Sequence, residues 1–268
     1  MSNLTVFLGV FKTRFISNIA YRWMTFGKIL AFLFQMLIVF YLWNSIFSWN
    51  NVDEINGFTF SELITYGIVA LFISNICITW LDSEIDFLVN TGNVLMKLTN
   101  PIKLNVYLFY IFLSDFIFSI LTVGLPGLLL SIFVLNVSIP ELSIIFAFII
   151  SLILAALINF FIDIFSGGLA FWTKEDIYGF RMIKTFLFAL FGGSFIPLLF
   201  FPQWFQTIAY LLPFQAAYNL PLLIYIGKIQ GFEIIISILL QLFWVIVLYF
   251  TSSIYLEKSI KRFEAFGG

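Results

Sequence analysis

Acidic side chains stand at several points in or beside strongly apolar stretches, and they are the residues of this sequence most able to do chemistry. Asp115 lies inside one apolar stretch, and Asp163 lies near the end of another. If such stretches cross a bilayer, a charge inside them costs several kcal/mol unless it is paired, hydrated or neutralised. Asp115 falls about nine residues into its stretch, roughly 13 Å at the rise of an α-helix. We expect it to line a hydrated cavity that attracts a cation, or to hydrogen-bond a neighbour as the neutral acid. Asp163 lies closer to an interface, where anchoring explains it and a cavity role is the alternative.

Other charges gather in two short polar segments. The first begins with Asp82, Glu84 and Asp86 and continues through Asn93 and Lys97, and the second holds Glu175, Asp176 and Arg181. Segments of this length are too short for a catalytic domain, but their charges are suited to docking against a partner protein. The alternative is that the charges only solvate two loops.

The remaining residue types exclude several kinds of chemistry. The chain has no His, and Cys77 is its single cysteine, so we expect no imidazole base, internal disulfide, zinc cluster or other metal site. A Gly-x-x-x-x-Gly-Lys-Ser/Thr loop for nucleotide phosphates is also missing from the sequence, so we expect no catalytic residue and no ATP hydrolysis in this chain. The formal net charge is -1, which leaves no basic surplus for nucleic acid.

The composition indicates an all-α polytopic membrane protein. Apolar residues make up 62% of the 268 residues and charged residues only 10%, whereas soluble domains carry roughly 25% charged residues. A bilayer-spanning helix needs about 20 apolar residues. Six stretches meet that length, and we predict spans at Ile29–Trp49, Glu62–Leu81, Val106–Leu135, Ser143–Phe165, Ile183–Phe200 and Ile234–Tyr255. We expect the third span to bend at Gly124, Pro126 and Gly127, because proline removes a backbone donor and clashes with the preceding turn.

The cations predict the orientation of the chain. Lys and Arg near span ends remain cytoplasmic, and six spans with both termini inside place every cation except Lys228 on the cytoplasmic side. The first apolar stretch begins only after 28 residues and lacks a small-residue cleavage site, so we expect the N-terminus to be retained. Both termini are therefore predicted to be cytoplasmic.

Three segments outside the spans have patterns of their own. In residues 1–28, apolar side chains at Leu4, Phe7, Phe11 and Phe15 predict an interfacial helix, with a frayed hydrophobic tail as the alternative. Residues 82–105 predict a short amphipathic helix, a break at Gly92 and a second short helix that ends before Pro101.

The third segment, residues 192–231, is apolar but rich in proline. Four prolines lie within 25 residues: Pro197, Pro202, Pro213 and Pro221. This density forbids one continuous span. We predict two half-length helices, 202–212 and 215–225, that form a re-entrant hairpin in the outer leaflet, buried in protein or facing a wet cavity. An ordinary interfacial loop is the alternative.

This segment resembles the ABC-2 type permeases, the membrane subunits of ATP-binding-cassette exporters, and in particular the six-span bacterial subfamily that includes viologen-exporter-like permeases. The resemblance rests first on Gly192-Gly193, Pro197-Leu198, Phe201-Pro202, Trp204, Leu212-Pro213-Phe214, Pro221, Tyr225 and Gly227-Lys228. It rests second on the polar segment from Asp82 to Pro101 with its central Gly92, and third on Phe171-Trp172. The resemblance covers most of the chain and implies one transmembrane domain over residues 1–268.

The resemblance also implies partners and roles. Two permease subunits, identical or similar, would sit on two separate ATPase subunits that hold ATP and Mg, so that this chain needs no cofactor of its own. Residues 82–105 would form the coupling loop, with Glu84, Asp86, Phe87, Asn93 and Lys97 against the ATPase. Glu175, Asp176 and Arg181 would make a secondary cytoplasmic contact, and Asp115, Pro197, Pro202 and Pro213 would belong to the pathway or its gate.

The function implied is that of an exporter permease in a bacterial plasma membrane. Peptides or antimicrobial compounds, hydrophobic cations and lipid-linked molecules all remain possible cargo. One alternative is a non-transporting immunity or sensory subunit. A less favoured alternative is an intramembrane lipid-modifying enzyme, which would normally need a cluster of reactive side chains that includes His.

Overall fold

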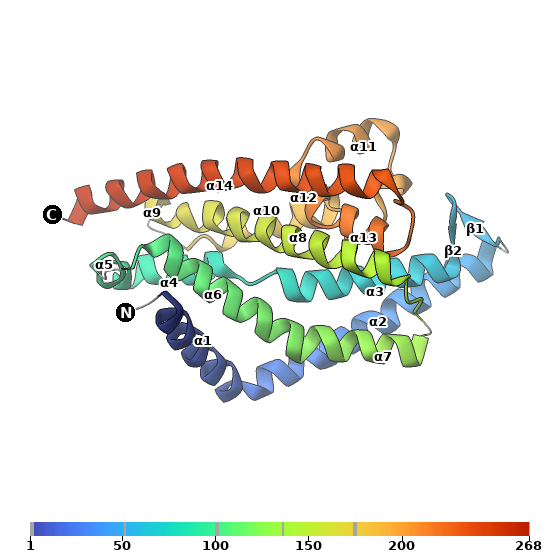
Figure 1. The fold of residues 1–268 in the computed structure, drawn as a ribbon, viewed down its shortest axis with the longest axis horizontal. Helices are drawn as coiled ribbons and strands as arrows, with labels where there is room; N and C mark the ends of the chain where they lie inside the picture. The colour runs from blue at the N-terminus through green and yellow to red at the C-terminus, as the bar shows by residue number, and fades with distance from the viewer. Residues whose placement is uncertain (1–2, 51, 100–101, 136, 174–175, 268) are drawn as a thin grey trace.

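The helices of the computed structural model run mostly along one axis, with both termini at one end (Figure 1). The structure describes residues 3–50, 52–99, 102–135, 137–173 and 176–267. The longer helices are α1 (Asn3–Ala20), α2 (Arg22–Asn50), α3 (Phe60–Cys77), α4 (Leu81–Asn90), α6 (Leu104–Ser119), α7 (Leu125–Leu135), α8 (Leu142–Gly168), α10 (Tyr178–Phe191) and α14 (Phe232–Gly267). The shorter elements are β1 (Glu54–Ile55), β2 (Phe58–Thr59), α5 (Asn93–Leu98), the π-helix η1 (Ile120–Gly124), α9 (Ala170–Thr173), the 3-10 helix η2 (Leu198–Phe200), α11 (Gln203–Tyr210), α12 (Pro213–Ala217) and α13 (Asn219–Tyr225).

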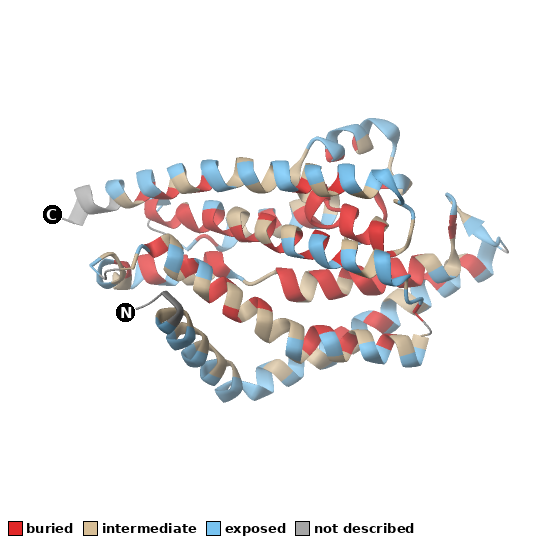
Figure 2. Ribbon diagram, in the orientation of Figure 1, coloured by how far each residue is buried: buried red, intermediate tan, exposed pale blue. Residues whose placement is uncertain are grey.

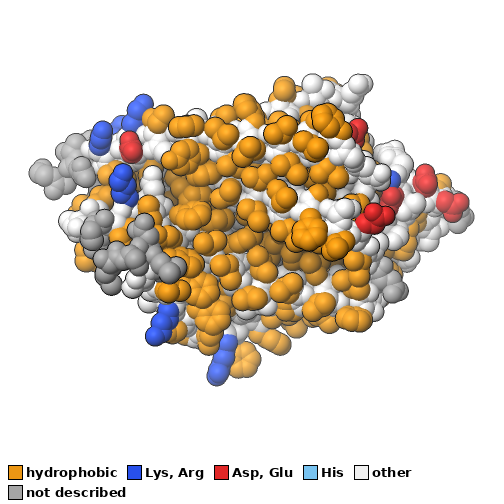
Figure 3. Space-filling view, in the orientation of Figure 1, with side chains coloured by type: hydrophobic (Ala, Val, Ile, Leu, Met, Phe, Trp, Pro, Cys, Tyr) orange, Lys and Arg blue, Asp and Glu red, His pale blue; other side chains and the backbone are white. Residues whose placement is uncertain are grey.

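Five helical stretches in the described residues are long and apolar enough to cross a membrane. They are Arg22–Asn50, Phe60–Asn90, Leu104–Leu135, Leu142–Thr173 and Phe232–Arg262. The helices Gln203–Tyr210 and Pro213–Tyr225 meet at 77° and make a sixth only if they are counted together. A broad hydrophobic surface separates an end rich in Lys and Arg from an end rich in Asp and Glu (Figure 3).

The core lies around α8. This helix packs along α14, α4, α12 and α13, and buried residues concentrate in α3, α8, α12 and α13 (Figure 2). In contrast, α2 and α14 leave most of their surfaces exposed. For an apolar protein this pattern is expected of helices that face lipid on their outer sides.

The predicted fifth span, Ile183–Phe200, is wrong. Helix α10 ends at Phe191, and its 14 residues cover only about 21 Å. Gly192 is its C-cap, and Gly193 adopts a φ of +68° that L side chains rarely take. The C-terminal end of α10 packs against α12, with the ring centroids of Phe188 and Phe214 5.0 Å apart. Thus the expected single long helix is replaced by the shorter α10, which packs against α12 at its C-terminal end.

The predicted boundary of the N-terminal helix also needs correction. The N-terminal helix was predicted over residues 1–28, but α1 ends at Ala20 and α2 already begins at Arg22. The stripe of phenylalanines packs against α6, with Phe7 against Tyr110 and Phe15 against Phe118 at centroid distances of 5.5 Å. The stripe is therefore partly explained by helix packing.

The predicted bend in the third span is present. Figure 1 shows the change of direction between α6 and α7. It coincides with η1, which ends at Gly124 and directly precedes the Leu125-Pro126 start of α7. The wider π turn takes up the hydrogen-bond register that Pro126 disturbs, since Leu125 N–H reaches back to the carbonyl of Ile120.

The end opposite the termini carries a small hairpin that was not predicted from the sequence (Figure 1). Its strands β1 and β2 pair through a turn in which Asn56 and Gly57 both have positive φ, as two-residue hairpin turns require. Lys228 Nζ binds the Gly57 carbonyl at 2.7 Å and the Glu62 carboxylate at 2.8 Å. The one cation predicted outside is thus paired at this end.

Candidate functional site

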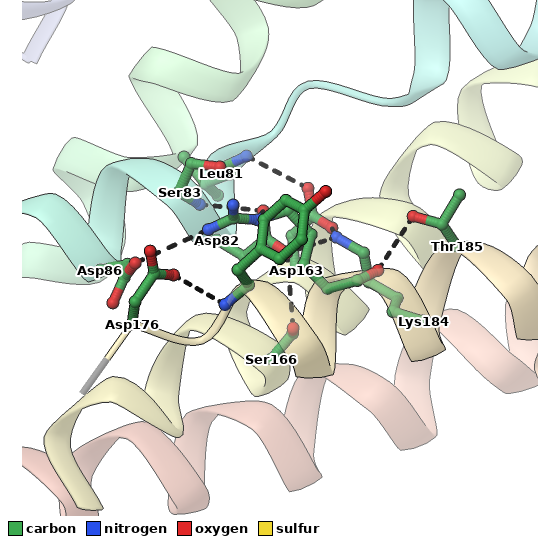
Figure 4. A network of polar contacts seen from close by, with 11 residues as sticks. Leu81, Asp82, Ser83, Asp86, Asp163, Ser166, Asp176, Lys184 and Thr185 are labelled. Atoms are coloured by element: carbon green, nitrogen blue, oxygen red, sulfur yellow. Dashed lines mark hydrogen bonds and ion pairs between the residues drawn. The ribbon is translucent and has the colours of Figure 1, made fainter. Parts of the chain in front are cut away.

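A buried group of five charges joins three helices and is the most concentrated polar feature of the described chain. We call it the inner ionic cluster: Asp82 and Asp86 of α4, Asp163 of α8, and Arg181 and Lys184 of α10 (Figure 4). Lys184 Nζ lies 2.5 Å from Asp82 Oδ2 and 2.6 Å from Asp163 Oδ1. Arg181 lies 3.5 Å from Asp82 and 3.7 Å from Asp86. One lysine therefore bridges two carboxylates from different helices.

The cluster forms where α3 and α4 are separated by a break. Helix α3 ends at Cys77, and Trp80 has a left-handed φ of +53° just before α4 begins. This break frees the first N–H groups of α4, and Asp163 Oδ2 accepts one of them from Leu81 at 3.3 Å. A carboxylate at a helix N-terminus is also stabilised by the helix dipole. Asp163 thus anchors the start of α4 to α8.

The charges of the cluster are nearly balanced. Three carboxylates face two cations, and the side chains of Asp82 and Asp163 are almost fully buried. Ser166 donates a further hydrogen bond to Asp82 at 3.4 Å. Because removal of one partner would leave a buried charge unpaired, the cluster fixes the relative positions of α4, α8 and α10.

The predicted coupling segment, residues 82–105, has the expected form: α4, a turn at Gly92 with φ +73°, and α5. The predicted residues differ in their surroundings, however. Asp86 is buried in the inner ionic cluster, and Glu84 pairs with Arg14 of α1 at 2.6 Å. Asp86 and Glu84 were predicted to set the register of a partner protein. In this structure both also form contacts within the chain.

Three apolar side chains of this segment are much more accessible than Asp86, although Ile85, Leu88, Val89 and Val94 are buried. Phe87 is 58% exposed, and Leu95 and Met96 of α5 are also exposed. We call these three residues the inner apolar patch.

The polar side chains of the segment have partners within the chain. Lys97 lies over the Tyr107 ring at 4.1 Å, and Asn93 donates a hydrogen bond to Thr91. Arg14 remains charged beside this segment: burial alone would lower its pKa, but its neighbours, Glu84 first and then Asp115, together outweigh burial and raise the pKa above its ordinary value.

The residues predicted for the secondary cytoplasmic contact also differ in their surroundings. Arg181 belongs to the inner ionic cluster, and Asp176 accepts a hydrogen bond from Tyr178 N at 2.7 Å at the start of α10. Glu175 lies outside the described residues.

Asp115 faces the N-terminal helix. It accepts a hydrogen bond from Asn18 at 3.4 Å and lines a cavity of about 220 Å³ together with Arg14 and Glu84. The hydrogen bond expected for Asp115 has a partner in Asn18 of α1, whereas the attraction of a cationic ligand stays a prediction. The three prolines assigned to the pathway or gate stand at helix starts: Pro197 precedes η2, Pro202 caps α11 and Pro213 opens α12.

A second polar feature is a groove between α2, α3 and α10. Its volume is about 450 Å³. We call it the central groove. Lining side chains come from α2 (Lys28, Gln35), α3 (Leu71, Ser74, Asn75), the α3–α4 break (Ile78, Trp80), α10 (Thr185, Phe188, Ala189) and the following segments (Ser194, Phe195, Tyr218). Helix α10 therefore carries Lys184 of the inner ionic cluster next to Thr185 of the central groove.

Lys184, Lys28 and Gln35 were not predicted as site residues from the sequence. A usable signal for Lys184 was present in the spacing. Asp82 and Asp86 are four residues apart and Arg181 and Lys184 three apart, so each pair shares one helix face, and the two faces have opposite charge. Gln35 was detectable as the single amide in the apolar run from Ile29 to Trp43.

Comparison with known proteins places these features in a family. A family model described as ABC-2 family transporter protein matches residues 8–267, and no curated protein matches the chain. The match takes in the helices that form the inner ionic cluster and the central groove. The chain belongs to the ABC-2 family of transporter proteins and is a multi-pass membrane protein of a transport system.

Proposed function

We propose that this chain is the permease subunit of an ABC exporter in a bacterial plasma membrane, with both termini cytoplasmic. Membership of the family implies an ABC ATPase as partner. Two permeases, identical or homologous, would form the pathway within the lipid, and ATP and Mg would be held by the ATPase alone. The viologen-exporter-like subfamily and the treatment of residues 1–268 as one domain belong to the same proposal.

The observation that carries this proposal is the chain of contacts from the coupling segment to the central groove. The inner apolar patch on α4–α5 offers a surface for the ATPase, and we assign Glu84, Asn93 and Lys97 of the same segment to this contact. The buried Asp86 would act through the inner ionic cluster. The inner ionic cluster ties α4 to α10, where Lys184 precedes the groove residue Thr185. A rigid-body displacement of α4 by the ATPase would therefore move the wall of the central groove.

The outer part of the pathway would be formed by the bent pair α11 and α12–α13. The 77° angle between them and their start at Pro202 and Pro213 are consistent with a re-entrant hairpin in the outer leaflet. We assign Pro197, Pro202 and Pro213 to the gate because they fix where these short helices begin. Asp115, with Arg14 and Asn18, would respond to the position of α1 beside the pathway.

The first test is purification of the tagged chain from its native membrane in mild detergent. We expect an ATPase to co-purify, and we expect its ATP hydrolysis in lipid nanodiscs to depend on the permease. Phe87→Asp in the inner apolar patch should abolish that dependence, because a charge would replace an exposed apolar contact. Asn56→Asp in the distant β1–β2 turn is the matched control and should leave it unchanged.

Two results would contradict the proposal. Absence of any ATP-hydrolysing companion would remove the exporter assignment. A companion whose hydrolysis is independent of this chain would instead favour the non-transporting immunity or sensory subunit.

A further inference from the structure

The central groove contains polar side chains at a depth where lipid cannot satisfy them. Gln35 lies 13 residues into α2, roughly 20 Å along the helix, and it is exposed to the groove. No hydrogen bond joins its amide to another described residue, and Lys28 has no ion pair within the described ranges. An unsatisfied polar group in hydrocarbon costs several kcal/mol. These side chains must therefore meet a solvated or ligand-filled space.

The charge of this groove has one sign. Lys28 is its charged lining residue, and none of the described lining residues is acidic. On α10, Arg181 and Lys184 are engaged in the inner ionic cluster. Asp115 of α6 lines a different cavity with Arg14 and Glu84; it interacts electrostatically with Lys28 but forms no ion pair with it among the described residues. A cationic ligand would thus meet a lysine and no carboxylate in the central groove.

The remaining surface of the groove is partly apolar. Leu71, Phe188 and Phe195 line the groove together with Ser74, Asn75 and Thr185. Its volume of about 450 Å³ falls within the range of ligand sites. Lys28 and Gln35 are seven residues apart on α2, two turns along one face, or about 10 Å. A ligand with a charged head and a hydrocarbon portion can contact both parts at once.

The geometry points to an amphiphile with an anionic headgroup as the ligand of the central groove, held by Lys28 at its head and by Gln35 farther along. Its role as transported cargo rests on the proposed function, but the binding itself does not. This assignment narrows the cargo classes and disfavours hydrophobic cations. Charge-assisted hydrogen bonds contribute about 1.5–3 kcal/mol, which corresponds to roughly tenfold or more in affinity.

The test measures binding to the full chain alone in phosphatidylcholine nanodiscs, so that it is independent of any ATPase. The probes are an undecanoate that carries a dansyl group and the matched dansyl undecylamine. We expect the anionic probe to bind about tenfold more tightly than the amine, and Lys28→Gln to weaken its binding about tenfold. Lys12→Gln removes an exposed cation outside the groove and is the matched control, while Lys28→Arg should retain binding.

A second arm distinguishes two sources of the anionic headgroup. Displacement of the probe by phosphatidylglycerol in the nanodisc would assign the site to a membrane lipid, and lack of displacement would assign it to a soluble amphiphile. Equal affinity for the two probes, or equal effects of Lys28→Gln and Lys12→Gln, would overturn the inference. Neither result would alter the ATPase measurement above, so the two proposals fail separately.

Discussion

Lys184 neutralises two buried carboxylates that come from different helices. Its ammonium group compensates Asp82 and Asp163 at 2.5 and 2.6 Å, and both carboxylates are buried. Without the lysine, Arg181 alone would face three carboxylates. Breaking a buried pair by removal of one partner costs about 3–5 kcal/mol.

We therefore expect Lys184→Met to lower the thermal unfolding temperature markedly, as followed by tryptophan fluorescence in detergent. The double variant Asp163→Asn/Lys184→Met restores the net charge of the cluster and should recover more than half of the loss. A Lys184→Met protein as stable as the wild type would show that the cluster does not hold these helices together.

The sequence located some of these residues but not their association. It identified Asp163 as an anchor near an interface, yet it assigned Asp86 and Arg181 to two separate loop contacts. Hydropathy treats each segment independently, whereas the cluster arises because the α3–α4 break turns one face of α4 toward α8 and α10. Complementary spacing of charges on two segments was the only available signal.

At the scale of elements, close packing of α4 on α8 is as important as the charges. A Cβ added at Gly167 of α8 would lie 2.7 Å from Ile85 Cδ1, 2.9 Å from Ile85 Cβ and 3.1 Å from Asp82 Cα. Because one of these atoms belongs to the backbone of α4, the clash requires the helix itself to move. The position of the coupling segment therefore depends on a glycine in another helix.

Gly167→Ala should destabilise the protein by about 1–3 kcal/mol through overpacking, measured as the midpoint of thermal unfolding. Gly9→Ala in α1 is the matched control, because no atom lies within 4 Å of its added Cβ and alanine favours a helix. It should be neutral or slightly stabilising. Equal midpoints for the two variants would contradict the close α4–α8 contact.

The sequence predicted most helical elements because their signals are local. The Gly92 break and the two short helices of the coupling segment follow from residue patterns, as does the irregularity before Pro126. The fifth span was misplaced because the apolar sequence continues across Gly192 and Gly193, whereas the helix ends there. The β1–β2 hairpin was too short to give a periodic pattern.

At the scale of the whole molecule, the two ends differ in charge and construction. One end carries both termini, the inner apolar patch and most of the Lys and Arg residues, and the other carries the β1–β2 hairpin with its acidic side chains (Figure 3). This asymmetry is what the positive-inside rule expects of a membrane protein. The orientation stays a prediction because it was inferred from the same cations, and under the proposed function the ATPase would dock at the cation-rich end.

Site-specific photo-crosslinking in native membranes tests the central claim most directly. A photoreactive residue replaces Met96 in the inner apolar patch or, as the control, Asn56 in the β1–β2 turn. We predict that the Met96 probe crosslinks to a separate polypeptide with a nucleotide-binding motif and that the Asn56 probe does not. A nucleotide-binding partner captured from Asn56, or none captured from Met96, would contradict an ATPase-driven permease coupled through α4–α5.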